Sequence, residues 1–111
     1  MQINELKKAE SLLRESLQIY ETITPNAWLT LYTKGKLGEL MRLQKNYAEA
    51  ETILTEVRDK MFLRRKKASP AESKQFFEIS RYLFYVFTET KQKDKLEELK
   101  AKRSAWYRKE D

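Results

Sequence analysis

The sequence of 111 residues contains no cysteine and no histidine. Without cysteine the chain forms no disulfide and offers no thiolate to a metal ion, a composition that is typical of the reducing cytoplasm. Without histidine it lacks the residue that most often acts as a general base or as a metal ligand. We therefore predict a cytoplasmic protein that holds no metal ion and no cofactor.

Other routes to catalysis are not indicated either. The stretch Gly35–Gly38 is too short for a glycine-rich phosphate loop and has no strand before it. Carboxylates such as Glu49, Glu51 and Glu56 fall at polar helix positions, where solvated glutamates are usual. The sequence therefore predicts a protein that is not an enzyme.

Glycine and proline are scarce, with two residues of each. Sheet sandwiches and barrels need more turn chemistry than this, whereas the apolar residues recur at the spacing of helices. No apolar run approaches the roughly 20 residues of a membrane-spanning helix. We therefore expect an all-α fold in one domain over residues 1–111, with no membrane segment.

The apolar pattern divides the chain into five helices. Ser69, Pro70 and Glu72 form the signature of a capping box with proline at the first helical position, so a helix begins there. The last helix contains Leu96 and Trp106. The expected ranges of the first three helices are about 2–22, 26–43 and 47–63.

The first helix carries two apolar stripes, which are about 100 degrees apart at 3.6 residues per turn. An arc of this width predicts neighbours on two sides of the helix, or a face that a second copy or another protein covers. The first stripe contains Leu6, Leu13, Leu17 and Tyr20, and the second contains Leu12, Ile19 and Ile23.

Gly38 interrupts an apolar helical pattern, at a cost of about 1 kcal/mol relative to alanine. The number of positions from Gly38 to the polar break at residues 44–46 is about the same as the number from this break to Ala50. In a helical hairpin the two small residues would meet and let the helix axes approach closely. We therefore predict a contact between Gly38 and Ala50.

An internal repeat accompanies this hairpin. Ala9 aligns with Ala50, 41 positions later, and the residues that follow them align as well. A weaker third copy places Leu96 a further 46 positions on. Repetition at this scale predicts a solenoid of helical hairpins.

The chain resembles the tetratricopeptide repeat (TPR), in the longer form found in kinesin light chains. It is also similar to the repeats at the carboxyl end of bacterial serine/threonine protein kinases. The resemblance implies a half repeat over residues 2–24, a repeat over 25–63 and a divergent repeat over 70–108. Its motif residues here are Leu37, Gly38, Met41, Tyr47, Ala50 and Leu54.

In this family the first helix of each hairpin lines a concave face that binds peptides. The resemblance implies that residues such as Gly35 point inward, and that a protein or peptide ligand contacts arginine, tyrosine and carboxylate side chains. An inert inner face is the alternative. The candidate partner-binding residues are Tyr32, Glu39, Arg42, Arg81, Tyr85 and Glu89.

Four consecutive cations, Arg64, Arg65, Lys66 and Lys67, stand out in a chain of net charge +6. They are a candidate contact for nucleic acid or another polyanion. The alternative is a solvated loop at the carboxyl end of a helix, where cations complement the helix dipole. The loop reading is favoured because no base-stacking aromatic residue is interleaved in the run.

Three functions remain open at this point. The favoured one is a non-catalytic protein-interaction module within a larger signalling protein. The second is a basic helical domain that binds nucleic acid or another polyanion. The third is a structural or dimerisation segment, in which a homodimer forms through the first helix.

Overall fold

The computed structural model describes residues 2–108, which form five α-helices and one short 3₁₀-helix. No strand occurs within this range. The predicted all-α fold of five helices is confirmed, with the second helix beginning at residue 28 rather than 26. The elements are α1 (Ile3–Ile23), α2 (Trp28–Leu43), α3 (Tyr47–Phe62), η1 (Arg65–Lys67), α4 (Pro70–Glu89) and α5 (Lys93–Ala105).

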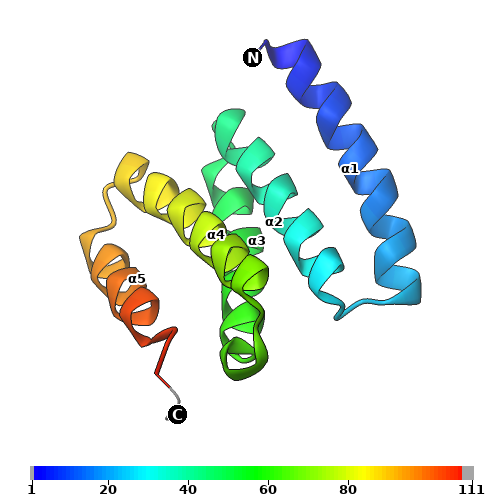
Figure 1. Cartoon of the computed structure of the whole chain (residues 1–111). Coiled ribbons are helices and arrows are strands. Elements are labelled where there is room, and N and C mark those ends of the chain that lie inside the picture. The colour runs from blue at the N-terminus through cyan, green and yellow to red at the C-terminus, as the bar shows by residue number, and fades with distance from the viewer. Residues whose placement is uncertain (1, 109–111) are drawn as a thin grey trace.

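Each α-helix packs against the next one along the chain, and α2 also packs against α4. Figure 1 shows α1 and α5 at opposite edges of the molecule, with α2, α3 and α4 between them. The extents along the principal axes are 44, 37 and 19 Å. The smallest extent corresponds to two layers of helices, since a helix with its side chains is about 10–12 Å across.

The core lies where α2, α3 and α4 meet. Most of its apolar side chains on α3 and α4 have lost all contact with solvent, while α1 adds Leu6 and Leu17, and α5 adds Leu99, with Trp106 just beyond its end. The fully buried apolar residues of α3 and α4 are Ala50, Leu54, Val57, Met61, Phe76, Ile79, Leu83 and Val86.

The nearest neighbours of a side chain at Gly38 are Leu54 and Ile53, and not the predicted Ala50. A Cβ atom on Gly38 would lie 2.6 Å from Cγ of Leu54 and 3.2 Å from Cγ2 of Ile53. The missing side chain thus makes room for branched residues one turn beyond Ala50, and Ala50 is itself fully buried. The close approach of α2 and α3 at Gly38 exists, but it accommodates large side chains instead of pairing two small ones.

Gly35 provides a second close approach, this time between α2 and α4. A Cβ atom there would clash with the tip of Ile79 and lie 3.6 Å from Cγ1 of Val57. Gly35 is buried and contacts the core, so its expected place on the inner face is wrong.

The turns after α2 and α4 have the same geometry. Lys45 and Lys91 both adopt positive φ, at 63° and 59°. After α2, Asn46 N–H donates to the Met41 carbonyl at 2.8 Å, and after α4 Gln92 N–H donates to the corresponding carbonyl, also at 2.8 Å. Both are Schellman turns, and equivalent positions stand 46 residues apart.

The capping box at the start of α4 is confirmed. The Glu72 amide donates to Ser69 Oγ at 3.1 Å, and the Ser69 amide donates to Glu72 Oε1 at 3.0 Å. These bonds satisfy two backbone donors that the first turn of a helix otherwise leaves without partners.

Only one of the two stripes of α1 is covered by the described part of the chain. Leu6 and Leu17 are buried, but Leu12, Ile19 and Ile23 are 65%, 58% and 72% exposed. We refer to these three exposed residues as the α1 stripe. Between residues 2 and 108, no helix has the combination of length and apolar character that crossing a membrane requires.

Candidate functional site

A line of polar contacts joins α2 to α4 along their length, and we call it the α2–α4 seam. The partner on α4 stands 46 or 47 positions after the residue on α2 at every step, so the two helices run parallel in a constant register. The contacts, in order, are Trp28–Gln75, Tyr32–Glu78, Lys36–Tyr82 and Arg42–Glu89.

The centre of the seam is built around the carboxylate of Glu78. Tyr32 Oη donates to its Oε1 at 2.8 Å, while Lys36 and Tyr82 both donate to its Oε2. Lys36 Nζ also lies 2.8 Å from Tyr82 Oη. Two phenols and one ammonium group therefore surround one carboxylate.

The pKa values at the centre of the seam follow from these contacts. Burial alone would raise the pKa of Glu78, but hydrogen bonds from Lys36, Tyr82 and Tyr32 bring it below its usual value. Burial and the hydrogen bond to Glu78 raise the pKa of Tyr82 to about 12. At neutral pH Glu78 is therefore ionised and the phenol of Tyr82 remains a hydrogen-bond donor.

The carboxyl end of the seam is organised by Arg42. Its guanidinium group binds Glu39 through two hydrogen bonds of 2.6 and 2.8 Å and Glu89 through one of 2.7 Å. Its Cζ lies 4.8 Å from the ring centroid of Tyr85, and Tyr47 Oη donates to Glu89 at 3.1 Å. The hydrogen bond to Glu39 is the largest cause of a raised pKa at Arg42. Arg42 thus links side chains of α2 and α4 directly, and Tyr47 of α3 joins them through Glu89.

Five of the six predicted partner-binding residues lie in this seam, and Arg81 does not. Four of the five use their polar groups within the chain, and Tyr85 contributes its ring to a contact with Arg42, so these residues are ordered but few of their polar groups remain for a ligand. Arg81 is exposed on α4 and makes no ion pair with any residue between 2 and 108. The five residues in the seam are Tyr32, Glu39, Arg42, Tyr85 and Glu89.

Arg81 shares the exposed face of α4 with two aromatic rings, and we call Arg81, Phe84 and Tyr85 the α4 patch. Phe84 and Tyr85 are 40% and 36% exposed, and their rings form an edge-to-face pair with centroids 6.1 Å apart. Phe84 is not among the residues predicted to bind a partner. The signal was its position, because Phe84 lies away from the face that Ile79 and Leu83 bury in the core.

The four cations of the basic run have different surroundings. Arg65 lies over Phe62, with its Cζ 4.3 Å from the ring centroid. Arg64 donates to the backbone carbonyl of Asn26, just before α2. Arg64, Lys66 and Lys67 line a hollow beside Trp28, so an aromatic residue stands near the run although none is interleaved in it.

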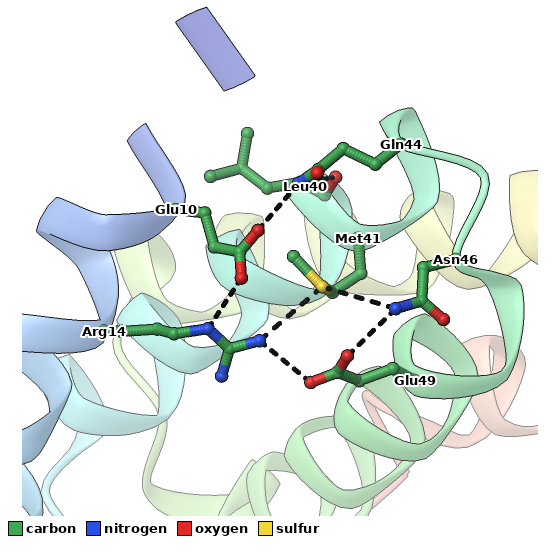
Figure 2. A network of polar contacts seen from close by, with 7 residues as sticks. All are labelled: Glu10, Arg14, Leu40, Met41, Gln44, Asn46 and Glu49. Atoms are coloured by element: carbon green, nitrogen blue, oxygen red, sulfur yellow. Dashed lines mark hydrogen bonds and ion pairs between the residues drawn. The ribbon is translucent and has the colours of Figure 1, made fainter. Parts of the chain in front are cut away.

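A second network attaches α1 to the turn between α2 and α3, as Figure 2 shows. Arg14 binds Glu10 at 2.8 Å and Glu49 at 2.9 Å, and Asn46 donates to Glu49 at 3.0 Å. Gln44 donates to Glu10, and this bond, followed by that from Arg14, lowers the pKa of Glu10. The Arg14 side chain is 45% exposed, so solvent screens these charges.

Polar contacts also join α3 to α5. Arg58 is 3% exposed, and its guanidinium group lies 2.9 Å from Asp59 and 3.4 Å from Glu98. Gln92 donates to Glu51 at 2.8 Å. Arg58 could not be identified from the sequence, because its partner Glu98 is 40 positions away and only the fold brings the two together.

The chemistry available at these places is recognition by hydrogen bonds, ion pairs and aromatic faces. Within residues 2–108, no three His, Cys, Asp or Glu side chains gather closely enough to hold a metal ion. Comparisons with models of protein families, with curated proteins and with solved structures found no match. The resemblance to the TPR family therefore remains a prediction from the residues.

Proposed function

We propose that this chain is a non-catalytic protein-interaction module, built as a TPR-like stack of helical hairpins and forming part of a larger signalling protein. The turns of the hairpins α2–α3 and α4–α5 are equivalent at an offset of 46 residues. The α2–α4 seam keeps nearly the same offset over its whole length. A repeated offset in both turns and helix contacts is what stacked repeats produce.

The single observation that carries the binding proposal is the α4 patch. Arginine and tyrosine are among the residue types in which binding energy is most often concentrated. Tyr85 rests against Arg42, which is itself held by Glu39 and Glu89. Because the ring is already ordered in the free protein, a peptide that binds it loses less conformational entropy.

Selection of ligands from a random peptide library displayed on phage, with the whole chain as the target, tests this proposal. The double variant Arg81→Ala/Phe84→Ala removes two exposed side chains that take no part in the α2–α4 seam. We expect selected peptides to bind this variant at least about tenfold more weakly, which corresponds to about 1.4 kcal/mol.

The matched control is Lys60→Ala, an exposed residue of α3, which should leave the affinity unchanged. Both variants should melt within a few degrees of the parent chain, because the altered side chains lie on the surface. Peptides that bind the double variant as tightly as the parent would contradict a role for the α4 patch.

A second candidate function is self-association through α1, and the α1 stripe favours it. Leu12, Ile19 and Ile23 recur at the spacing of one helix face, and all three are more than half exposed. Burying such side chains against a second copy would be favourable by the hydrophobic effect. Sedimentation velocity over a range of concentrations should detect a dimer, and a monomer at every concentration would contradict this candidate.

A further inference from the structure

The described part of the chain contains a hollow of about 400 Å³ at the end of the helix stack where α2 begins, α3 ends and α4 begins. A volume of this order admits one or two side chains of a ligand. The residues that line it are Trp28, Leu63, Arg64, Lys66, Lys67 and Glu72.

Two of these residues form apolar walls. Leu63 is 81% exposed, although it directly follows the last turn of α3. The indole of Trp28 is held in place by a hydrogen bond of 2.6 Å from its Nε1 to Gln75. A ligand would therefore meet an exposed aliphatic side chain and an aromatic side chain whose orientation is already fixed.

The charge in the hollow is positive. Neither Arg64 nor Lys67 pairs with a carboxylate of residues 2–108. The one carboxylate in the lining, that of Glu72, accepts the Ser69 amide in the capping box. Arg64 is oriented by its bond to the Asn26 carbonyl, which uses one of five guanidinium N–H groups and leaves the others for an anion.

We propose that this hollow binds a short acidic peptide segment of a partner protein. One apolar side chain of the segment lies between Trp28 and Leu63, and carboxylates on either side of it pair with Arg64 and Lys67. The site is independent of the function proposed above, because it contains no residue of the α4 patch or the α1 stripe.

An acidic peptide fits these observations better than a nucleic acid does. Proteins that bind a phosphate backbone present cations along a track, and single-stranded binders add several stacking aromatic residues. Here Arg58, Lys95 and Lys102, on the neighbouring helices α3 and α5, are paired with carboxylates. The hollow itself contains one aromatic residue, and Leu63 would gain nothing from a phosphate. An acidic segment with one apolar side chain matches both the cations and the apolar side chains that line the hollow.

Fluorescence anisotropy with the whole chain tests the proposal. The probe is a fluorescein-labelled peptide with a central leucine flanked on both sides by aspartate and glutamate. A second peptide carries glycine in place of the leucine, and a labelled oligothymidine represents the polyanions. We expect the leucine peptide to bind at least about tenfold more tightly than either of the others.

Variants locate the site. Arg64→Gln/Lys67→Gln should weaken binding of the leucine peptide about tenfold or more, and Lys67→Gln alone should weaken it by a smaller factor. Lys91→Gln/Lys93→Gln removes the same charge from the exposed turn before α5 and from the first residue of that helix, and should have little effect. Arg81→Ala/Phe84→Ala should not change this affinity, which separates the hollow from the α4 patch.

Four results would overturn the proposal. The first is no binding of the leucine peptide, and the second is equal binding of the leucine and glycine peptides. The third is tighter binding of the oligothymidine, which would assign the hollow to nucleic acid. The fourth is an equal loss of affinity in Arg64→Gln/Lys67→Gln and in Lys91→Gln/Lys93→Gln, which would mean that net charge alone attracts the peptide.

Discussion

The two terminal helices, α1 and α5, lie at opposite edges of the molecule (Figure 1). The side chains on their outer faces differ. All large apolar side chains of α5 are at least partly buried, and Leu99 is 1% exposed. On α1, Leu12 and Ile19 are 65% and 58% exposed, although Leu17 is buried. The two edges therefore present chemically different surfaces to solvent.

The attachments of the two helices differ as well. Beyond α5, the Trp106 ring stacks on Phe76 with centroids 3.9 Å apart and donates to Ser73 at 2.9 Å. The polar part of the α1 attachment includes one exposed ion pair, Arg14–Glu49, worth about 0–1 kcal/mol, and the hydrogen bond from Gln44 to Glu10. With its exposed apolar side chains, the α1 edge is therefore better suited to a further contact than the α5 edge.

The largest expected effect comes from removing the anchor of the α5 edge. Trp106→Ala deletes a ring that is 2% exposed and leaves Ser73 without its donor. We expect the free energy of unfolding to fall by about 3–5 kcal/mol, as measured by urea denaturation. Ser104→Ala, at an exposed position of α5, should change it by less than about 0.5 kcal/mol. A small loss for Trp106→Ala would mean that α5 is no better attached than α1.

A change at the centre of the α2–α4 seam, which lies between the two edges, should also lower the free energy of unfolding. Glu78→Gln removes the charge that Lys36 and two tyrosines bind, and we expect a loss of about 1.5–3 kcal/mol at pH 7. Because the folded state lowers the pKa of Glu78, its stabilisation is complete above the unfolded value of 4.5. The stabilisation disappears as the pH falls through the lower folded value.

The measurement is urea denaturation of the parent chain and of Glu78→Gln from neutral pH down to about pH 3. The difference between the two should be constant above about pH 5 and should shrink in acid. A difference that does not depend on pH would show that the amide loses packing or hydrogen bonds and that the charge of Glu78 contributes nothing.

A substitution at Gly38 tests how closely α2 and α3 pack in the hairpin that α1 contacts. Gly38→Ala places a methyl group against Cγ of Leu54, a branch point that cannot simply rotate away. We expect a net loss of about 1–2 kcal/mol by thermal denaturation, after the better helix propensity of alanine is counted. Gly35→Ala should cost less, because the nearest atom there is the end of the Ile79 side chain. The opposite order would contradict a tight contact of α2 with α3 at Gly38.

The positions of the helices could be predicted from the sequence because they depend on local patterns. Pro70 and the capping box mark the start of α4, and the apolar spacing gives the other four helices. The partner of Gly38 could not be predicted in the same way. Rise per residue gives its height along α2 but not the rotation of α3, so Leu54 rather than Ala50 faces it.

The candidate site shows a similar limit. The resemblance to TPR repeats was enough to predict that Arg42 and Tyr85 lie on neighbouring helices. In the structure, Cζ of Arg42 is 4.8 Å from the ring centroid of Tyr85. The resemblance gave no indication that Glu89 would bind Arg42, since an ion pair across 47 residues depends on the offset between α2 and α4, whereas Glu39 stands only three positions before Arg42 on the same helix. Likewise Trp28 and Arg64 meet at one hollow only because α2 begins where α3 ends.

The smallest effect on stability, and the sharpest test of the two edges, is expected at the α1 stripe. Leu12→Gln/Ile19→Gln replaces two exposed apolar side chains, so the unfolding free energy of the monomer should change by less than about 0.5 kcal/mol. If the stripe is a contact between copies, sedimentation velocity should find the parent chain dimeric at high concentration and this variant monomeric. Ser11→Gln/Thr22→Gln, at exposed positions of α1 outside the stripe, should leave the dimer intact. A parent chain that stays monomeric at every concentration would mean that the exposed apolar residues of α1 attract no second copy, and the two edges would then not differ in self-association.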